Sequence, residues 1–339
     1  INIFDFNKLP LAGSFQDTKN SGELFPLTLV KCSNCELIQT GESISKVKIF
    51  KTYSYETKTS SNLVKHLNSL AELINNIKNN ANIFEIGCND GTLLKRLNKL
   101  GHKCIGIDPS NIAKESSIKN KWNLINDFFD LKIAKRILDE YGSFDFVIST
   151  NSFAHNDEIE NITKGIWDIL KEDGYLLIEV QNGFETLNKN QFDTIYHEHT
   201  CYFTRKSIIN LLEKNKFKII YIKNIDIHNG SIRVLAKKVL APISQYNSFK
   251  LRDKTEDLNL KIINFQKTII KNKQNLNQIL KTEYAKGKKI VAYGASGRAT
   301  ILLNYYELDN DIISYIVDNS SKKINKYIPN TSIKIKNKK

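Results

Sequence analysis

Residues 193–199 (Asp-Thr-Ile-Tyr-His-Glu-His) place a phenol, a carboxyl group and an imidazole within four positions, those of Tyr196, Glu198 and His199. Enzymes use these three groups to donate and accept protons. A surface loop with incidental charges would contain the same residue types. The segment follows an apolar run at 174–180, however, and residues just after a buried parallel strand often face a ligand crevice. We therefore interpret them as acid–base residues.

A further imidazole, that of His155, follows another apolar run at 144–150. In an open sheet of parallel strands, this position lies at the carboxyl edge, where ligands bind. The alternative is a histidine that only caps a short helix. Tyr53 and Tyr55 are read from their own surroundings as structural aromatic residues.

The elements that would position these side chains alternate between strand and helix. Strands are predicted at 82–88, 103–108, 123–127, 144–150 and 174–180, and helices at 92–100, 131–141 and 159–171. Such alternation predicts a parallel sheet covered on both faces. After a helix at 206–213, strands at 218–225 and 231–238 flank the turn His228-Asn229-Gly230, which favours an antiparallel pair at one edge of the sheet.

The flanking regions differ from this α/β core. Residues 1–60 show little periodicity, and an amphipathic helix is predicted at 62–78. The polar segment 250–286 has apolar residues on one face and reads as a connecting helix. A strand, glycine turn, helix and strand then follow, at 289–293, 294–297, 298–306 and 312–318. This unit resembles half of a nucleotide-binding fold.

Length and composition are those of a soluble protein with more than one compact unit. The chain has 339 residues, 41% of them hydrophobic, and a net charge of +14, and one core seldom grows to this length. Its lysines are scattered, so we expect no nucleic-acid partner and read the charge as favouring solubility and an anionic substrate. There is no apolar run of about 18 residues and no signal peptide. The five cysteines fit a reducing compartment, and we expect a cytoplasmic protein without a membrane partner.

A glycine turn between the first strand and the first helix of the alternating region has the form of a cofactor loop. Glycines let a ligand approach the backbone, and the following helix N-terminus favours a negative group. Asp108, at the tip of the next strand, can accept hydrogen bonds from ribose hydroxyls, and Asp127 and Phe128 can hold an adenine. The residues of the turn assigned to the cofactor are Glu85, Gly87, Asn89, Asp90 and Gly91. With the antiparallel ending, this set favours S-adenosylmethionine over a nicotinamide cofactor.

Cys32 and Cys35 have the spacing of half a zinc knuckle. A structural zinc site needs four ligands, usually from two such pairs, and the other cysteines occur singly inside predicted elements. Two ordinary thiols in a turn are the alternative. The chain also lacks methionine, which suggests that residues precede Ile1 or that modified methionines are absent from the printed sequence.

Seven short motifs occur in order along the chain. They lie at 10–13 (Pro-Leu-Ala-Gly), 31–35 (Lys-Cys-Ser-Asn-Cys), 53–60 (Tyr-Ser-Tyr-Glu-Thr-Lys-Thr-Ser), 85–91 (Glu-Ile-Gly-Cys-Asn-Asp-Gly), 196–199 (Tyr-His-Glu-His), 229–233 (Asn-Gly-Ser-Ile-Arg) and 293–297 (Tyr-Gly-Ala-Ser-Gly). Together they resemble the bacterial C-methyltransferases that act on nucleotide-linked deoxysugars. The resemblance spans nearly the whole chain.

The resemblance implies an α/β architecture with a Rossmann-like class I methyltransferase domain at its centre. The expected divisions are a zinc-binding-type or substrate segment at 1–60, the methyltransferase domain at 61–245, a connecting helix at 246–286 and an α/β half-Rossmann nucleotide-type domain at 287–339. The zinc segment of the family carries two cysteine pairs, and Cys32 and Cys35 match the second. The first would lie upstream of Ile1.

The resemblance also implies a reaction. A carbon beside the ketone of a 4-keto-deoxysugar, expected to be C3, loses a proton, and the resulting enolate attacks the methyl of S-adenosylmethionine with inversion. Imidazole is a weak base for a carbon-bound proton, so the enolate oxygen needs donors. We expect His199 as base, Glu198 as its orienting partner or a ligand of a substrate hydroxyl, and His155 as enolate stabiliser. Tyr196 and the family's catalytic tyrosine, which falls at Tyr55, would be substrate-facing donors.

Substrate contacts are assigned to residues of the strand ends and of the C-terminal unit. They are Asn182, Asn229, Arg233, Tyr293, Ser296 and Arg298. An exchange of roles between Tyr196 and His199 stays open. Two other classes of function stay open as well, an O- or N-methyltransferase, which needs no enolate site, and a non-catalytic binding protein of the same fold.

Overall fold

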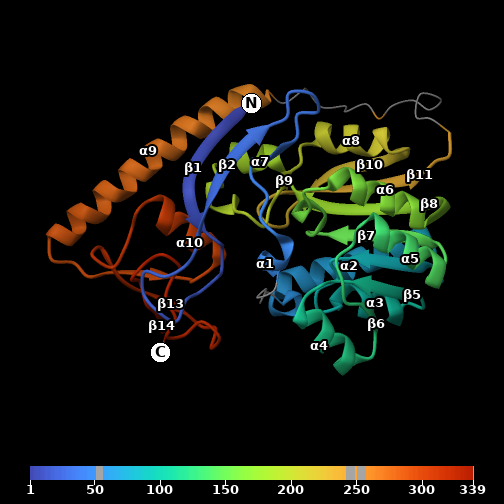
Figure 1. Ribbon diagram of the computed structural model, residues 1–339, viewed down its shortest axis with the longest axis horizontal. Helices are drawn as coiled ribbons and strands as arrows, with labels where there is room; N and C mark the ends of the chain where they lie inside the picture. Colours follow the sequence, from blue (N-terminus) through green and yellow to red (C-terminus); the bar gives the residue numbers. More distant parts are fainter. Residues whose placement is uncertain (51–55, 242–248, 250–256, 339) are drawn as a thin grey trace.

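The computed structural model describes residues 1–50, 56–241, 249 and 257–338 (Figure 1). Its centre is a seven-stranded sheet with the order β10-β11-β8-β7-β4-β5-β6. The strands are β4 (Asn82–Ile86), β5 (Lys103–Ile107), β6 (Asn123–Ile125), β7 (Phe144–Thr150), β8 (Leu170–Gln181), β10 (Phe217–Ile225) and β11 (Ser231–Lys238). The first five pair in parallel, and β11 is antiparallel to both β8 and β10. The predicted parallel sheet with an antiparallel pair at one edge is confirmed.

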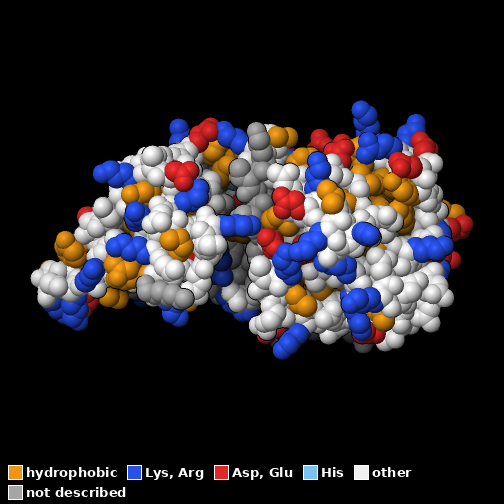
Figure 2. Space-filling view, turned by 90° about the horizontal axis from the view of Figure 1, so that it is seen from below, with side chains coloured by type: hydrophobic (Ala, Val, Ile, Leu, Met, Phe, Trp, Pro, Cys, Tyr) orange, Lys and Arg blue, Asp and Glu red, His pale blue; other side chains and the backbone are white. Residues whose placement is uncertain are grey.

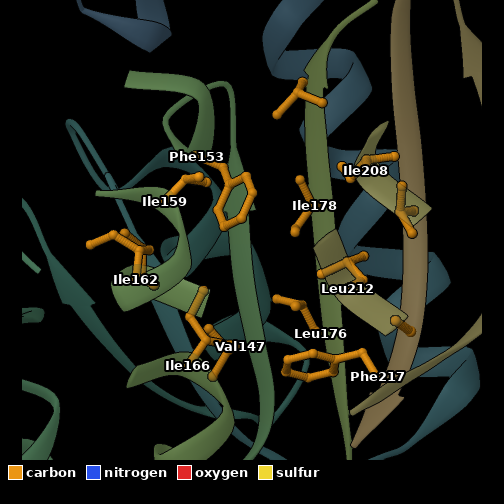
Figure 3. Packing of buried hydrophobic residues seen from close by; sticks show 14 of the residues in the cluster. Val147, Phe153, Ile159, Ile162, Ile166, Leu176, Ile178, Ile208, Leu212 and Phe217 are labelled. Carbon is orange, nitrogen blue, oxygen red and sulfur yellow. The ribbon is translucent and has the colours of Figure 1, made fainter. Parts of the chain in front are cut away.

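Two layers of helices enclose this sheet because each helix buries one apolar stripe against it. One buried cluster joins the sheet to α2 (Ser61–Ile77), α3 (Thr92–Lys99) and α4 (Asn111–Asn120). Another joins it to α5 (Leu131–Tyr141), α6 (Ile159–Ile169) and α8 (Arg205–Lys214). Figure 3 shows part of this second cluster, in which Ile162 and Ile166 of α6 pack beside Val147 of β7. Helix α4 was not predicted, since Ala113 is its one buried residue among those described.

The first forty residues form a sheet, which their weak periodicity did not predict. Strands β1 (Asn2–Pro10), β2 (Leu24–Lys31) and β3 (Ile38–Thr40) pair antiparallel, and β9 (Cys201–Tyr202) completes the sheet. β9 comes directly after the segment that carries Tyr196, Glu198 and His199. The N-terminal sheet therefore fixes one end of that segment.

The C-terminal part follows a long helix, α9 (Leu258–Ala285), which lies along β1 in Figure 1. Beyond it come β12 (Ile290–Tyr293), α10 (Gly297–Tyr305), β13 (Ile313–Asp318) and β14 (Ile335–Asn337), and the three strands pair in parallel. The predicted half-Rossmann unit is confirmed, with β14 as an addition. The helix predicted at 250–286 is described from Leu258, where Asp257 caps it by accepting from the backbone nitrogen of Leu260 over 3.0 Å, and 250–256 lie outside the described residues.

The N-terminal sheet and the C-terminal part share one buried cluster. Phe6 of β1, Phe265 of α9 and Ile301 of α10 all belong to it. The rings of Phe4 and Phe265 meet edge to face with centroids 6.5 Å apart. The two ends of the chain therefore pack together beside the central domain.

The distribution of basic side chains and the character of the helices can be described for the part of the chain in the structure. On the face seen in Figure 2, Lys and Arg side chains are dispersed over the molecule rather than gathered in one patch. Within the described ranges, no helix is long and apolar enough to cross a membrane.

Candidate active site

A cavity of about 610 Å³ opens at the carboxyl ends of β4, β5, β7 and β8. Its volume is in the range of small-molecule and cofactor sites. It brings together many of the residues selected from the sequence, namely Glu85, Gly87, Asn89, Asp108, Asp127, Phe128, His155, Tyr196, His199 and Arg298. Tyr55 lies outside the described residues.

The glycine turn after β4 has no room for side chains. Gly87 has φ +71°, and a Cβ added there would lie 2.3 Å from the Cβ of Ser152. The Ser152 hydroxyl in turn donates to the carbonyl of Ile86 over 2.6 Å. The turn is thus packed against the loop after β7, which keeps its backbone close to the cavity.

The buried carboxyl group of Glu85 suits contact with a positively charged group of a ligand. It is 2% exposed, lines the cavity, and its Oε2 has no hydrogen-bond partner among the described residues. Burial first, and then the carboxylates of Asp108 and Asp90, raise the pKa of Glu85 well above its usual value. A buried carboxyl group without a partner is costly, and the ammonium and sulfonium groups of S-adenosylmethionine would supply opposite charge.

Asp108 is held at the tip of β5 with its carboxylate on the cavity wall. It accepts hydrogen bonds from the backbone nitrogens of Asn89 and Ser110, both over 2.9 Å. Asp127 accepts from the backbone nitrogen of Phe128 over 2.8 Å, at the end of the neighbouring strand. These positions agree with contacts to ribose and adenine.

Asp90 and Gly91 shape the turn and are not among the described residues that line the cavity. Asp90 is fully buried, and its carboxylate accepts from the backbone nitrogen of Lys58 over 2.9 Å and from the Thr92 hydroxyl over 2.6 Å. The two carboxylate oxygens of Asp90 are therefore engaged within the protein, where they hold the backbone at Lys58 against the turn. Asn89 makes a parallel contact, accepting from the backbone nitrogen of Thr57 over 3.0 Å.

His199 is oriented by a backbone carbonyl. Its Nδ1 lies 3.0 Å from the oxygen of Thr194. Because a carbonyl oxygen only accepts, the neutral ring carries its proton on Nδ1 and keeps a lone pair on Nε2. The partner of Nδ1 is thus the Thr194 carbonyl and not Glu198, for which contact with a substrate hydroxyl was the other expected role.

Two rings flank His199. The ring of Tyr196 lies with its centroid 4.1 Å away, and that of His155 lies at 4.9 Å. The loop after β7 reaches this place because the Thr200 hydroxyl donates to the carbonyl of Ala154 over 3.0 Å. The ring of Phe50 also stacks on His155, with centroids 6.1 Å apart.

Both imidazoles are uncharged near neutral pH. Burial lowers the pKa of His155 to about 4. Burial, and then the charge of a protonated His155, lowers the pKa of His199 well below its usual value. One ring can therefore accept a proton while the other donates a hydrogen bond.

Glu198 has a different environment from its neighbours. The cavity lining formed by the described residues does not include it. Burial raises the pKa of its carboxyl group to about 8. Glu198 is thus largely protonated at neutral pH and can act as a hydrogen-bond donor.

Two of the residues assigned to substrate have other partners, and a third lies in a turn. Asn182 caps a helix by accepting from the backbone nitrogen of Phe184 over 3.0 Å. Asn229 lies in the turn between β10 and β11. Arg233 donates through Nε to Glu179 over 2.5 Å in a buried ion pair. None of the three belongs to the cavity lining within the described part of the chain.

Of the three C-terminal residues assigned to substrate, Arg298 lines the cavity. Tyr293 is 66% exposed, and Ser296 caps α10 by accepting from the backbone nitrogen of Ala299 over 3.1 Å. Arg298 lines the cavity and forms a two-point contact with Asp193, with nitrogen to oxygen distances of 2.8 and 3.0 Å. Arg298 therefore connects the C-terminal part to the segment that carries Tyr196 and His199.

Sequence reasoning missed cavity residues that lie in turns. Asn151 follows β7 in the left-handed conformation, with φ 58°, and its backbone nitrogen donates to the carbonyl of Glu179 over 2.8 Å. His228, with φ 51°, lines the cavity from the β10–β11 turn. An Asn directly after a buried strand was a usable signal, because Asn tolerates this backbone conformation better than most residues.

Cys32 and Cys35 supply two thiols in one turn. Backbone N–H groups of Cys35 and Asn34 lower the pKa of the Cys32 thiol, and burial raises that of Cys35. Across the residues that the structure describes, no group of three or more His, Cys, Asp or Glu side chains could hold a metal. Two thiols alone do not make the four-ligand set of a structural zinc, so the predicted zinc site is not supported.

Comparisons with known proteins match two families along the chain. Residues 57–222 match a methyltransferase domain family, and residues 226–339 match the C-methyltransferase C-terminal domain. C-methyltransferase NovU of Streptomyces niveus is 25% identical over 99% of this chain and 82% of its own. The ubiquinone biosynthesis O-methyltransferase of Pelagibacter ubique is 28% identical, over 35% of this chain and 49% of its own.

Among solved structures, the PH0226 protein of Pyrococcus horikoshii is 17% identical. It matches with a TM-score of 0.45 over 57% of this chain and 98% of its own. The strand order, the glycine turn with its acids, and the two matched families that follow one another along the chain all agree with methyl transfer. The chain therefore belongs to the S-adenosylmethionine-dependent C-methyltransferases, with a class I methyltransferase domain followed by the C-methyltransferase C-terminal domain.

Proposed function

We propose that the protein methylates a carbon beside the ketone of a nucleotide-linked 4-keto-deoxysugar, at C3, through an enolate. The observation that carries this proposal is the pair of uncharged imidazoles in the cavity, of which His199 has its proton placed on Nδ1 by Thr194. Transfer to an oxygen or nitrogen needs a single base. Transfer to carbon needs a base and a separate donor for the enolate oxygen, and the position of His155 in the cavity beside His199 supports it as that donor.

The chain's own residues would act in sequence. Nε2 of His199 accepts the carbon-bound proton, and the electrons of that bond move toward the ketone oxygen. The N–H of His155, with Tyr196 and Tyr55 as further donors, would hydrogen-bond to the oxygen as its charge develops. Each such donor contributes roughly 3 to 4 kcal/mol to transition-state stabilisation. S-adenosylmethionine supplies the electrophilic methyl group that the enolate carbon attacks.

The nucleotide part of the substrate is supported by cations on the cavity wall. Lys46 and Arg298 both line the cavity, from α1 (Lys46–Phe50) and α10. Arg298 uses Nε and one Nη atom on Asp193, and its guanidinium has further N–H donors. Those donors suit a diphosphate, the anionic part of a nucleotide sugar.

Incubation of nucleotide-linked 4-keto-deoxysugars with S-adenosylmethionine labelled with ¹³C in the methyl group tests the proposal. We expect a product in which NMR shows the labelled carbon bonded to a ring carbon beside the ketone. A labelled methyl on oxygen or nitrogen would contradict C-methylation of this substrate class. S-adenosylmethionine binding without any product from the whole series would contradict the substrate assignment.

A further inference from the structure

The loop that orients His199 is fixed to the C-terminal domain at two points. Residues Phe192–Thr194 form the short helix η3, and Asp193 of this helix pairs with both Nε and Nη2 of Arg298. The ring of Phe192 stacks on Tyr306, with centroids 5.2 Å apart and an angle of 15° between planes. Both partners belong to the end of the chain that packs beside the central domain.

The residue after Asp193 carries the carbonyl that matters for the base. The Thr194 oxygen accepts from Nδ1 of His199 over 3.0 Å and from the Tyr202 hydroxyl over 3.1 Å. A shift of η3 would therefore move the acceptor that keeps the His199 proton on Nδ1. Without that hydrogen bond, the ring would also populate the tautomer protonated on Nε2, which has no lone pair for the substrate proton.

We propose that the C-terminal domain sets the tautomer of His199, through the Arg298–Asp193 contact and the adjoining Thr194 carbonyl. Arg298 and Asp193 are positioning residues, since they act through Thr194. This inference rests on the proposed function, in which His199 is the base. It gives the C-methyltransferase C-terminal domain a part in proton transfer, in addition to any part in binding.

The Arg298–Asp193 pair is well suited to positioning and poorly suited to holding the fold together. The Arg298 side chain is 44% exposed, and exposed ion pairs contribute at most about 1 kcal/mol to stability. Its two-point geometry nevertheless fixes direction as well as distance. Arg298 also lines the cavity. An anionic substrate that contacts its remaining N–H donors would therefore affect the position of η3 through Asp193.

¹⁵N NMR of the histidine ring nitrogens tests this inference in the full-length protein. His199→Asn identifies the signals of His199, and the comparison uses wild type, Asp193→Asn and Arg298→Lys. Asp193→Asn leaves the cavity cation in place, and Arg298→Lys keeps the charge but cannot reproduce the two-point geometry. Lys322→Gln is the matched control, because it removes an ion pair from the C-terminal domain to Glu56 that does not involve η3.

The expected result is a wild-type His199 protonated on Nδ1, with a shift toward the Nε2-protonated tautomer in Asp193→Asn and a smaller shift in Arg298→Lys. Methylation by Asp193→Asn should fall roughly 10- to 100-fold in kcat, the size of a misplacement effect, with unchanged S-adenosylmethionine binding. Lys322→Gln should behave as wild type. An unchanged tautomer in Asp193→Asn, and in Phe192→Leu as a second variant, would overturn the inference. A shifted tautomer with full methylation would support the positioning and contradict His199 as base.

Discussion

The imidazole rings of His155 and His199 lie with their centroids 4.9 Å apart, although they come from loops after different strands. Burial lowers both pKa values, and the charge of a protonated His155 lowers the pKa of His199 further. The cavity therefore holds two uncharged rings at neutral pH. This relationship separates a proton acceptor from a hydrogen-bond donor without a metal or a permanent charge.

The first prediction concerns the pH dependence of turnover. Because the pKa of His199 lies well below its usual value of about 6.5, the base stays unprotonated under mildly acidic conditions, and kcat/KM should remain level as pH falls from 7 through about 6. His155→Gln removes a neighbour that lowers the His199 pKa, so its acid limb should appear at higher pH. Steady-state rates across pH measure both. Identical acid limbs near pH 6.5 in the two proteins would contradict the coupling.

The second prediction concerns the effect of Glu198 on the pH dependence of stability. Its folded-state pKa of about 8 exceeds the unfolded value of about 4.3, so the folded state binds more protons between these values. The protonated Glu198 carboxyl group therefore makes its full contribution to the free energy of unfolding below about pH 4.3. That contribution is lost as pH rises through about 8. Glu198→Gln should therefore gain stability relative to wild type between pH 5 and 8, measured by urea unfolding.

His155→Gln is the control, because the stability contribution of His155 changes with pH in the opposite direction. The folded pKa of His155 is depressed to about 4, so the unfolded state binds more protons between about 4 and 6.5, and wild type loses stability as pH falls through that window. His155→Gln should gain relative stability toward pH 5. Parallel profiles of wild type and Glu198→Gln would place Glu198 in a solvated environment.

A third prediction tests the cofactor site. Asp108 holds a carboxylate at the cavity wall, so Asp108→Ala should weaken S-adenosylmethionine binding by about 1.5 to 3 kcal/mol, the scale of hydrogen bonds to charged groups. Isothermal titration calorimetry measures the change. Asp139→Ala, an exposed position on α5, serves as control. Equal binding by Asp108→Ala and the control would remove Asp108 from the site.

A fourth prediction separates backbone and side-chain roles at Asn151. Asn151 has a φ of 58°, a conformation that Gly adopts without strain. Ala in this conformation destabilises the fold by roughly 1 to 2 kcal/mol. Asn151→Gly should unfold at a similar temperature to wild type, and Asn151→Ala should unfold earlier. Both should also lose turnover if the Asn151 side chain contacts a ligand in the cavity that this residue lines. Full turnover in Asn151→Gly would restrict Asn151 to a backbone role.

Sequence patterns predicted those parts of the fold in which local signals agree with the tertiary structure. The strands that became β4, β5, β6, β7 and β8 are apolar runs that end in glycine or polar residues, and each ends near its predicted place. The N-terminal sheet was missed because bulges between Asn2 and Phe4, and between Asp5 and Lys8, break the alternation of β1. Its fourth strand, β9, comes from a distant part of the chain.

Sequence reasoning selected residues of the cavity where the side-chain type itself suggests the chemistry, and it selected residues outside the cavity lining where a partner decides the role. His155 and His199 were identified because imidazoles at strand ends have few structural uses. Arg233 was assigned to substrate, although its ion pair with Glu179 forms only when β11 pairs with β8. The Thr194 carbonyl could not be found in the same way, since every residue has a backbone carbonyl.

The most direct test of the account is solvent exchange at the carbon that His199 is proposed to deprotonate. The protein is incubated in D₂O with a nucleotide-linked 4-keto-deoxysugar and without S-adenosylmethionine, and the ring carbon beside the ketone is followed by NMR and mass spectrometry. We predict incorporation of deuterium by wild type and a loss of at least roughly 10²- to 10⁴-fold in rate in His199→Asn, with S-adenosylmethionine binding intact. Exchange and methylation at near wild-type rates in His199→Asn would contradict the assignment of the base and move it to Tyr196.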